Sequence, residues 1–248
     1  VPDLPFYYDE PFADSSAIPT TLVSKLARQK VTVALSADAG DEIFAGYNKY
    51  DFLARVKYKI DKIPAPLRKS AVALMQHIPA HKIPYFNTKP LFTTRYKKLM
   101  HLLKDSSTKE MLQNMAGIYF PDELNKLFLK TPLKLSSNFD QTLQKDYHDD
   151  LSYMMAIDYK TYMLDDILQK VDRASMTVSL EGREPFLDQH IIEFAAQLPA
   201  DYKLHKGIKK YPLRQIVHKY VPQNMMERPK MGFGIPIADW LKNELKVF

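Results

Sequence analysis

The first fifty residues alternate apolar and polar positions in a way that predicts a helix, a short strand and a second helix. Ile18, Leu22 and Leu26 recur every four residues and therefore form one apolar face of the first helix. This helix should begin at one of three capping residues, Asp14, Ser15 or Ser16. Residues 1–15 are rich in proline and aromatic side chains and are expected to be irregular.

The strongest strand pattern lies in residues 31–36, VTVALS, which are apolar and partly β-branched. Their nearly continuous apolarity predicts burial on both faces, as in a parallel sheet. A sharp turn follows, and a helical pattern then begins with Ile43, Phe44, Tyr47 and Tyr50. Helix, strand, turn and helix in this order are typical of an α/β protein.

Residues 51–150 are rich in lysine, leucine and tyrosine at helical spacing, and prolines divide them into modest helices. Helices are predicted within 67–78, 95–103 and 108–119, and a further helix start is predicted at Ser137 or Asn138. Because strand patterns are few, the chain as a whole is expected to be mainly α-helical.

Residues 151–248 continue the helical pattern. Residues 150–180 predict two helices, and a turn is expected around Pro185. A helix capped by Asp188, an amphipathic helix within 209–222 and a short C-terminal helix should follow. On these patterns we divide the chain into an α/β part at 1–50, a variable helical region at 51–150 and a second helical part at 151–248.

Composition narrows the class of protein. The 248 residues are 46% hydrophobic and 26% charged, which is typical of a globular protein. The chain has no cysteine, which excludes disulfides, thiolate metal sites and a cysteine nucleophile within it. No apolar run is long enough to span a bilayer and no signal peptide is recognisable, so neither a membrane partner nor export from the cytoplasm is expected.

The charge balance is mildly basic, with 35 lysines and arginines against 29 aspartates and glutamates. Such an excess fits the binding of anions such as nucleotides, although a solvated basic surface is the commoner reason. Net charge alone is weak support for a nucleic-acid binder, so no nucleic-acid partner is expected. The chain begins at Val1 rather than methionine, and we expect it to be a fragment.

The turn after the predicted strand is the first candidate site. It brings together Ser36, Asp38, Asp41 and Glu42, with small residues between them. A loop that joins a parallel strand to a helix favours anions, because free N–H groups and the helix dipole point to it. The acidic residues fit a site where one carboxylate holds Mg²⁺ against a phosphate. Ordinary capping of a helix by acidic residues remains an equal alternative.

Charges inside an apolar context form the second candidate site, at Lys170, Asp172, Arg173, Glu181 and Arg183. Buried charges are unfavourable unless they are paired. Without other information, a structural network of Glu181 with Arg183 or Asp172 with Arg173 is the simpler interpretation.

A loop with two glycines and two prolines is the third candidate site, and it presents Arg228 and Lys230. A lysine on such a loop can neutralise charge on a phosphate during transfer. For one lysine alone, a solvated surface position is the better interpretation.

Four segments, in order, resemble motifs of the glutamine-dependent asparagine synthetase family. DEPFADSSAIPTTLVSKLA and LSADAGDEIFAGYNKY resemble the family's DEPFxDxSxIPxxxxSxxA and LSGDGGDELFGGYxRY. KVDRASMTVSLEGREPFLD and RPKMGFGIPIADWL resemble KVDRxSMxxSLExRxPFLD and RPKxGFxxPxxxWL. Only the helical stretch at roughly 55–150 is poorly recognisable.

The resemblance implies a fold and a reaction. The fold would be the C-terminal part of an α/β, adenine-nucleotide-hydrolase-like synthetase domain of the PP-loop ATP pyrophosphatase type, with a small parallel-sheet remnant. ATP and a carboxylate, most simply aspartate, would give an acyl-adenylate and pyrophosphate. Ammonia, usually from glutamine, would then displace AMP to form an amide.

The resemblance also assigns roles to positions in this chain. Ser36, Ala37 and Gly40 would lie in the turn that binds ATP, and Asp41 would share Mg²⁺ with the pyrophosphate. Asp38, Glu181 and Lys230 would be catalytic: Asp38 in forming and using the adenylate, Glu181 on the substrate side and Lys230 on the α-phosphate. Arg183 and Asp172 would also lie on the substrate side.

Departures from the family pattern limit what the chain is expected to do alone. Ala37, Ala39 and Ala45 replace usual glycines, and a methyl group at Ala37 or Ala39 would narrow the approach of the nucleotide or require negative φ. The chain also lacks the family's SGGxDS pyrophosphate loop and its glutaminase domain. We therefore expect the isolated 248 residues neither to hydrolyse glutamine nor to make the adenylate efficiently.

Two alternatives stay open at this point. The chain could belong to a related synthetase that forms a different amide bond, such as that of a β-lactam, a macrolactam or the amide of a sugar acid. An inactive or truncated homologue could instead act as a structural or partner-binding module. A homodimer is compatible with either, and the sequence does not decide it.

Overall fold

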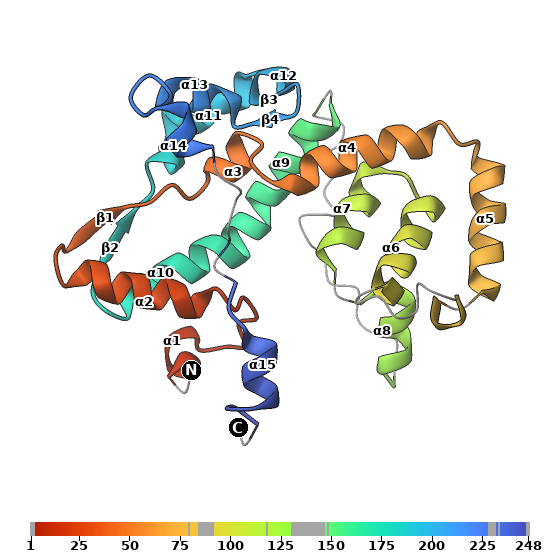
Figure 1. Cartoon of the computed structure of the whole chain (residues 1–248), viewed down its shortest axis with the longest axis horizontal. Coiled ribbons are helices and arrows are strands. Elements are labelled where there is room, and N and C mark those ends of the chain that lie inside the picture. Colours follow the sequence, from red (N-terminus) through yellow and green to blue (C-terminus); the bar gives the residue numbers. More distant parts are fainter. Residues whose placement is uncertain are drawn as a thin grey trace. The chain divides into compact units, whose positions relative to one another are not determined.

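A computed structural model gives the fold of the chain (Figure 1). It describes residues 3–78, 80–83, 92–117, 119–129, 147, 149–227, 232 and 234–246. These residues are mainly helical, as predicted, and include one parallel and one antiparallel two-stranded sheet. The chain divides into two compact units: residues 1–46 with 158–248 form unit 1, and residues 47–157 form unit 2.

Unit 1 contains both sheets. Its elements are α1 (Leu4–Tyr8), α2 (Ala17–Arg28), β1 (Val33–Leu35), α3 (Gly40–Ile43), the π-helix η4 (Met163–Leu168), α10 (Gln169–Met176), β2 (Glu181–Arg183), the 3-10 helix η5 (Pro185–Leu187), α11 (Gln189–Gln197), α12 (Ala200–Lys203), β3 (Leu204–His205), β4 (Ile208–Lys209), α13 (Tyr211–Val217), α14 (Gln223–Met226) and α15 (Ile237–Lys242). The boundary between the units falls within α9 (Asp150–Lys160).

Unit 2 contains helices and no strand among its described residues. Its elements are α4 (Asn48–Asp61), α5 (Ala65–His77), the 3-10 helix η1 (Ala80–Lys82), α6 (Phe92–Lys104), α7 (Thr108–Ala116) and α8 (Pro121–Leu127). Helices α5, α6 and α7 confirm the three helices predicted in this region. The helix start predicted at Ser137 or Asn138 lies outside the described residues.

The predicted strand is β1, and it pairs in parallel with β2, so that Leu35 lies opposite Arg183. The backbone N–H of Ser36 continues this ladder by donating to the Arg183 carbonyl over 2.9 Å. The predicted burial of the strand on both faces is wrong, since the Leu35 side chain is 73% exposed. The reason is that β1 has one partner strand among the described residues.

Helix α2 begins where the sequence predicts, and Asp14 organises its start. The Asp14 carboxylate accepts hydrogen bonds from the Ser16 backbone N–H (2.9 Å) and the Ser16 hydroxyl (2.7 Å). The buried side chains of α2 are small, whereas Leu22 and Leu26 on its apolar face are 56% and 64% exposed. Helix α2 packs closely against α10.

Three local predictions are wrong in part. Residues 1–15 are not wholly irregular, because α1 forms with a proline in its first turn, where the missing N–H has no helical partner to lose. The helical pattern that begins at Ile43 is split between α3 and α4, since Ala45 adopts a left-handed φ of 55°. Residues 150–180 form three helical segments, α9, η4 and α10, rather than two.

The end of the chain follows its sequence signals more closely. Asp188 caps α11, as predicted, by accepting from the backbone N–H groups of His190 (2.9 Å) and Ile191 (3.3 Å). Helix α13 lies within the predicted range 209–222, and α15 is the predicted short helix near the C-terminus. The 3-10 helix η5 is the predicted turn at Pro185, but the strand β2 before it was not predicted.

Two small apolar clusters in unit 1 fix the segment after β1. Ala39 packs with Met163 and Ile167 of η4. Ile43 and Phe44 pack with Ala195 of α11. Core contacts therefore hold both ends of α3, which follows the turn.

Candidate active site

The turn after β1 is organised by Ser36 and Asp38. The Ser36 hydroxyl donates to the Asp38 carboxylate over 2.6 Å, and the Asp38 backbone N–H donates to the Ser36 hydroxyl oxygen over 3.3 Å. The backbone N–H of Gly40 donates to the Ala37 carbonyl over 3.3 Å. Because the ladder with β2 ends at Ser36, this turn lies at the carboxyl end of a parallel strand pair, where α/β proteins commonly bind ligands.

The alanines that replace glycines behave differently from one another. Ala39 adopts a left-handed φ of 70°, so the expectation that a methyl group there requires negative φ is wrong. Ala39 is 1% exposed and packs with Met163 and Ile167, so it does not face an approaching ligand. Ala37, by contrast, is exposed.

Lys210 brings a positive charge to this turn, which sequence analysis missed. Its Nζ lies 3.1 Å from the Asp41 carboxylate, and its backbone N–H donates to the Phe44 carbonyl over 3.2 Å. Both charged side chains are partly shielded, with 30% of Lys210 and 23% of Asp41 exposed. No local pattern marks Lys210, because its partner lies far away in the sequence.

Gly46 leaves the space in which this ion pair sits. A Cβ atom at Gly46 would lie 1.9 Å from Asp41 Oδ1 and 2.3 Å from Lys210 Cε, and both distances are shorter than real contacts allow. At Gly40 a Cβ would be 3.7 Å from Lys210 Nζ. A side chain at position 46 would therefore force the Asp41 and Lys210 side chains to move from these positions.

Glu181 and Arg183 form an ion pair on one side of β2, as the structural interpretation of the sequence predicts. Arg183 Nε lies 2.7 Å from Glu181 Oε1, but 63% and 55% of the two side chains are exposed, so the pair is not buried. Glu181 lies opposite Val33 at the amino end of the strand pair, whereas Asp38 follows the carboxyl end. The structure therefore does not bring Glu181 and Asp38 together at one end of the strands.

Glu184 is the glutamate that follows the carboxyl end of β2, and sequence analysis missed it. Burial raises the pKa of Glu184, and the negative charges of Asp38 and, more weakly, Asp172 raise it further. Its carboxylate bends back over Gly182, where a Cβ would lie 3.0 Å from Glu184 Oε1. The sequence signal that could have identified Glu184 is its charge, which stands between Arg183 and Pro185 in an otherwise apolar segment.

The remaining predicted charges have other neighbours. Asp172 is exposed on α10 and is not paired with Arg173, which instead bonds Asp9 over 3.0 Å. Lys170 is buried and bonds Asp14. Arg228 and Lys230 lie outside the described residues.

Two features are absent from the part of the chain that the structure describes. No three His, Asp or Glu side chains there are grouped so as to hold a metal ion by themselves. None of the described helices is long and apolar enough to cross a membrane.

Known proteins resemble the chain along its whole length. The family model described as asparagine synthase matches residues 1–248. A glutamine-hydrolysing asparagine synthetase 1 of Bacillus subtilis (strain 168) is 33% identical, with 99% of this chain and 37% of the relative covered. A putative glutamine-hydrolysing asparagine synthetase of Mycobacterium tuberculosis (strain ATCC 25618 / H37Rv) is 31% identical, with 98% and 35% covered.

A more distant relative carries a different name. The amidase chyE of Penicillium rubens is 25% identical, with 88% of this chain and 34% of the relative covered. No solved structure matches. The chain spans little more than a third of the length of the curated relatives that it matches. The family match over all 248 residues and the ordered motifs that carry it show that the chain belongs to the asparagine synthase family.

Proposed function

We propose that the chain is part of an ATP-dependent ligase that forms an amide through an acyl-adenylate. The observation that carries the proposal is the turn 36–41, which lies at the carboxyl end of the parallel pair β1–β2 and combines the Ser36–Asp38 hydrogen bonds with the Asp41–Lys210 ion pair. Loops at this place in α/β folds bind nucleotide phosphates. The relatives named glutamine-hydrolysing asparagine synthetase support this reaction class.

The proposed roles at the phosphates divide between backbone and charged side chains. Ser36, Ala37 and Gly40 would bind ATP along the turn. Asp41 would hold Mg²⁺, which is usually bound by one or two carboxylates together with substrate phosphates, so a single protein carboxylate fits. When bound, Mg²⁺ would neutralise charge on the pyrophosphate. Lys210 now pairs with Asp41. When Mg²⁺ binds Asp41 instead, the Lys210 side chain would turn to a phosphate oxygen.

The reaction would proceed in two displacements. A carboxylate oxygen of the substrate attacks the α-phosphorus, and the bond to pyrophosphate breaks. An amine nitrogen then attacks the acyl carbon, AMP leaves with the bonding electrons, and the nitrogen loses a proton. Asp38 would act in forming and using the adenylate, and Lys230 would stabilise charge on the α-phosphate.

On the substrate side we propose Glu181, Arg183 and Asp172, and we add Glu184. Glu184 follows the carboxyl end of β2, the end near Asp38, whereas Glu181 lies at the amino end. The charge of Asp38 also raises the pKa of Glu184. A carboxylate there can bind the ammonium group of an amino-acid substrate. Aspartate is the first substrate to test, with nitrogen from glutamine, as the names of the relatives suggest.

We also propose a larger sheet and a division of roles along the chain. The parallel pair β1–β2 would be part of a PP-loop ATP pyrophosphatase-type sheet, with residues 1–50 and 151–248 around the ATP and substrate sites and 51–150 as a variable helical region. Since the curated relatives are almost three times as long, a glutaminase domain and a second phosphate loop would come from outside these 248 residues.

The test follows the nucleotide products of the full natural protein supplied with ATP, Mg²⁺, aspartate and glutamine. We expect AMP and pyrophosphate, formed only when the carboxylate substrate is present, as measured by chromatography of the nucleotides. A panel of other carboxylates identifies a relative with a different substrate. Formation of ADP and phosphate would contradict the proposal, because that pair of products does not arise from an adenylate.

A further inference from the structure

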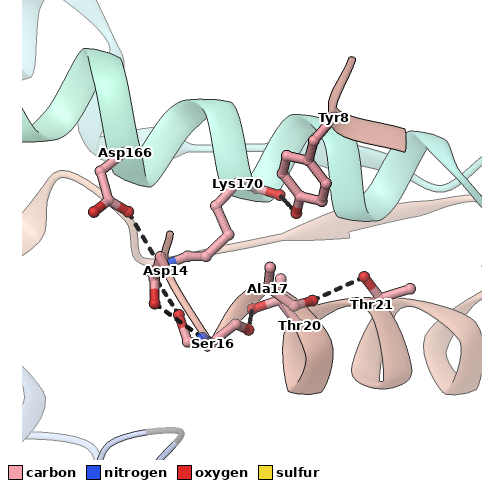
Figure 2. Close-up of polar contacts among 8 residues, drawn as sticks. All are labelled: Tyr8, Asp14, Ser16, Ala17, Thr20, Thr21, Asp166 and Lys170. Atoms are coloured by element: carbon pink, nitrogen blue, oxygen red, sulfur yellow. Dashed lines mark hydrogen bonds and ion pairs between the residues drawn. The ribbon is translucent and has the colours of Figure 1, made fainter. Parts of the chain in front are cut away.

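Three charged side chains from separate segments of unit 1 meet beside α2, and Figure 2 shows them. Asp14 precedes α2, Asp166 lies in η4 and Lys170 lies one turn later in α10. Lys170 Nζ is 2.6 Å from the Asp14 carboxylate and 4.0 Å from Asp166 Oδ1. The group therefore holds two carboxylates and one ammonium.

The group is shielded from solvent. The exposed fractions of the side chains are 11% for Lys170, 19% for Asp14 and 30% for Asp166. Asp166 Oδ1 is buried and accepts no hydrogen bond from the residues that the structure describes. Asp14 has several donors, since Ser16 bonds it as well as Lys170. Among the described residues, Asp14 thus has a close ammonium and further hydrogen-bond donors, whereas Asp166 Oδ1 has the same ammonium at a longer distance and no hydrogen bond.

The other titratable groups that face this cluster do not supply the missing charge. Tyr162, on the turn before η4, is neutral at ordinary pH, because burial and the nearby charge of Asp166 raise its pKa to about 12. The Tyr8 hydroxyl of α1 donates to the Lys170 carbonyl over 3.4 Å. Arg173, the next cation along α10, is bonded to Asp9.

We propose that Asp166 is a proton-dependent latch between η4–α10 and the segment before α2. When Asp166 takes up a proton, it donates a hydrogen bond to the Asp14 carboxylate, with which it shares Lys170 as a neighbour at 4.0 Å and 2.6 Å, and Asp14 keeps its bond from Lys170. When Asp166 loses the proton, two carboxylates share one ammonium and repel each other. No further reactant is needed, since the proton comes from solvent.

The pKa values of the two carboxyl groups are shifted in opposite directions. Burial raises the pKa of Asp166 to about 6, and the neighbouring Asp14 carboxylate adds to the rise. For Asp14, burial acts upward, but hydrogen bonds from Lys170 and Ser16 outweigh it and lower the pKa to about 2. The ordinary value for both is 3.8.

The sign of each effect on stability follows from proton linkage. Asp166 contributes stability that is complete below its ordinary pKa and is lost as pH rises through about 6. Asp14 contributes stability above its ordinary pKa that is lost as pH falls towards about 2. The two contributions together are therefore largest near pH 4, and the latch weakens as pH rises from there to about 6.

The latch acts on helices that border the candidate active site. Helix α10 follows η4 directly, packs on α2 and β2, and carries Asp172. Val171 and Ser175 of α10 lie close to Gly182, over which the Glu184 carboxylate bends. A π-helix such as η4 is a local irregularity that often marks a functional position in a helix. The proposal does not depend on the reaction that the site performs.

The experiment compares Asp166→Asn with Asp165→Asn in the 248-residue chain. Asp165 is exposed in the same π-helix, so its replacement makes the same charge change without touching the latch. The aspartate carboxyl carbons are followed by NMR across the pH range, and urea unfolding midpoints are measured at about pH 5 and about pH 7.5.

We expect one aspartate of the wild type to titrate near pH 6, to be lost in Asp166→Asn and to be kept in Asp165→Asn. We also expect the urea midpoints of the wild type and Asp165→Asn to fall between the two pH values, and that of Asp166→Asn to fall much less. Histidines titrate in the same range, but all three proteins share them.

Two results would overturn the latch. One is an Asp166 carboxyl that titrates near its ordinary value in the wild type. The other is an Asp166→Asn variant that shows the same pH dependence of stability as the wild type. If Asp166→Asn does not fold, the wild-type titration alone tests the latch. An aspartate that titrates near pH 6 supports the latch, and the absence of such an aspartate overturns it.

Discussion

Replacement of Lys170 by methionine should lower the free energy of unfolding by about 2–4 kcal/mol near neutral pH. Lys170 is the only cation that bonds Asp14 among the described residues, and its Nζ lies 2.6 Å from the carboxylate. Removal of Lys170 leaves the shielded Asp14 carboxylate with its hydrogen bonds from Ser16 but without its counter-charge, which costs more than the intact pair contributes. The estimate is at the low end for buried pairs, because 19% of the Asp14 side chain is exposed.

Urea unfolding of Lys170→Met and Lys25→Met tests this expectation. Lys25 is exposed in the last turn of α2, so its replacement changes the net charge in the same way without removing a shielded pair. We expect Lys25→Met to stay within about 0.5 kcal/mol of the wild type. Equal effects of the two replacements would show that Lys170 does not compensate the carboxylates.

Replacement of Asp41 by asparagine should lower the rate of AMP formation by the full natural protein about 100-fold. In the proposed site Asp41 is the carboxylate that holds Mg²⁺ against the pyrophosphate, and asparagine keeps its shape but not its charge. Lys210, which lies 3.1 Å from Asp41, would also lose its partner. The loss should appear mainly in the turnover rate and should be partly relieved by a higher Mg²⁺ concentration.

Asp201→Asn is the matched control for this loss. Asp201 is exposed on α12, in the same unit, and its replacement makes the same charge change. We expect its rate of AMP formation to equal that of the wild type. An Asp41→Asn enzyme with an unchanged rate would remove Asp41 from the phosphate site, whatever else the turn does.

Local signals predicted the starts of α2 and α11. Asp14 and Asp188 were expected at helix starts, and both accept backbone N–H groups there. Capping depends on residues two or three positions apart, so the sequence contains the whole interaction. The split between α3 and α4 was missed because the left-handed backbone of Ala45 does not show in a pattern of apolar residues.

Burial was predicted less well than secondary structure. The apolar residues Leu22 and Leu26 of α2 are exposed, whereas small residues such as Ala17 are buried. Strand β1 was expected to be buried on both faces and is not. Periodicity identifies an apolar face, but which face is covered depends on elements from other parts of the chain, here α10 and β2.

In the candidate site, too, neighbours in sequence could be predicted and contacts between distant residues could not. The turn 36–41 was recognisable because its residues are adjacent in sequence. Lys210 and Glu184 were not, since they reach the turn through the fold. The pairing of Lys170 with Asp14, which are 156 positions apart, was also beyond local patterns.

The central claim is that an acyl-adenylate forms at the turn after β1, and the transfer of oxygen tests it most directly. The full natural protein is given aspartate labelled with oxygen-18 in its side-chain carboxylate, together with ATP, Mg²⁺ and glutamine, and the AMP is analysed by mass spectrometry. We predict that AMP acquires one labelled oxygen, because the carboxylate oxygen bonded to the α-phosphorus leaves with it. AMP without the label, formed together with asparagine, would contradict the account.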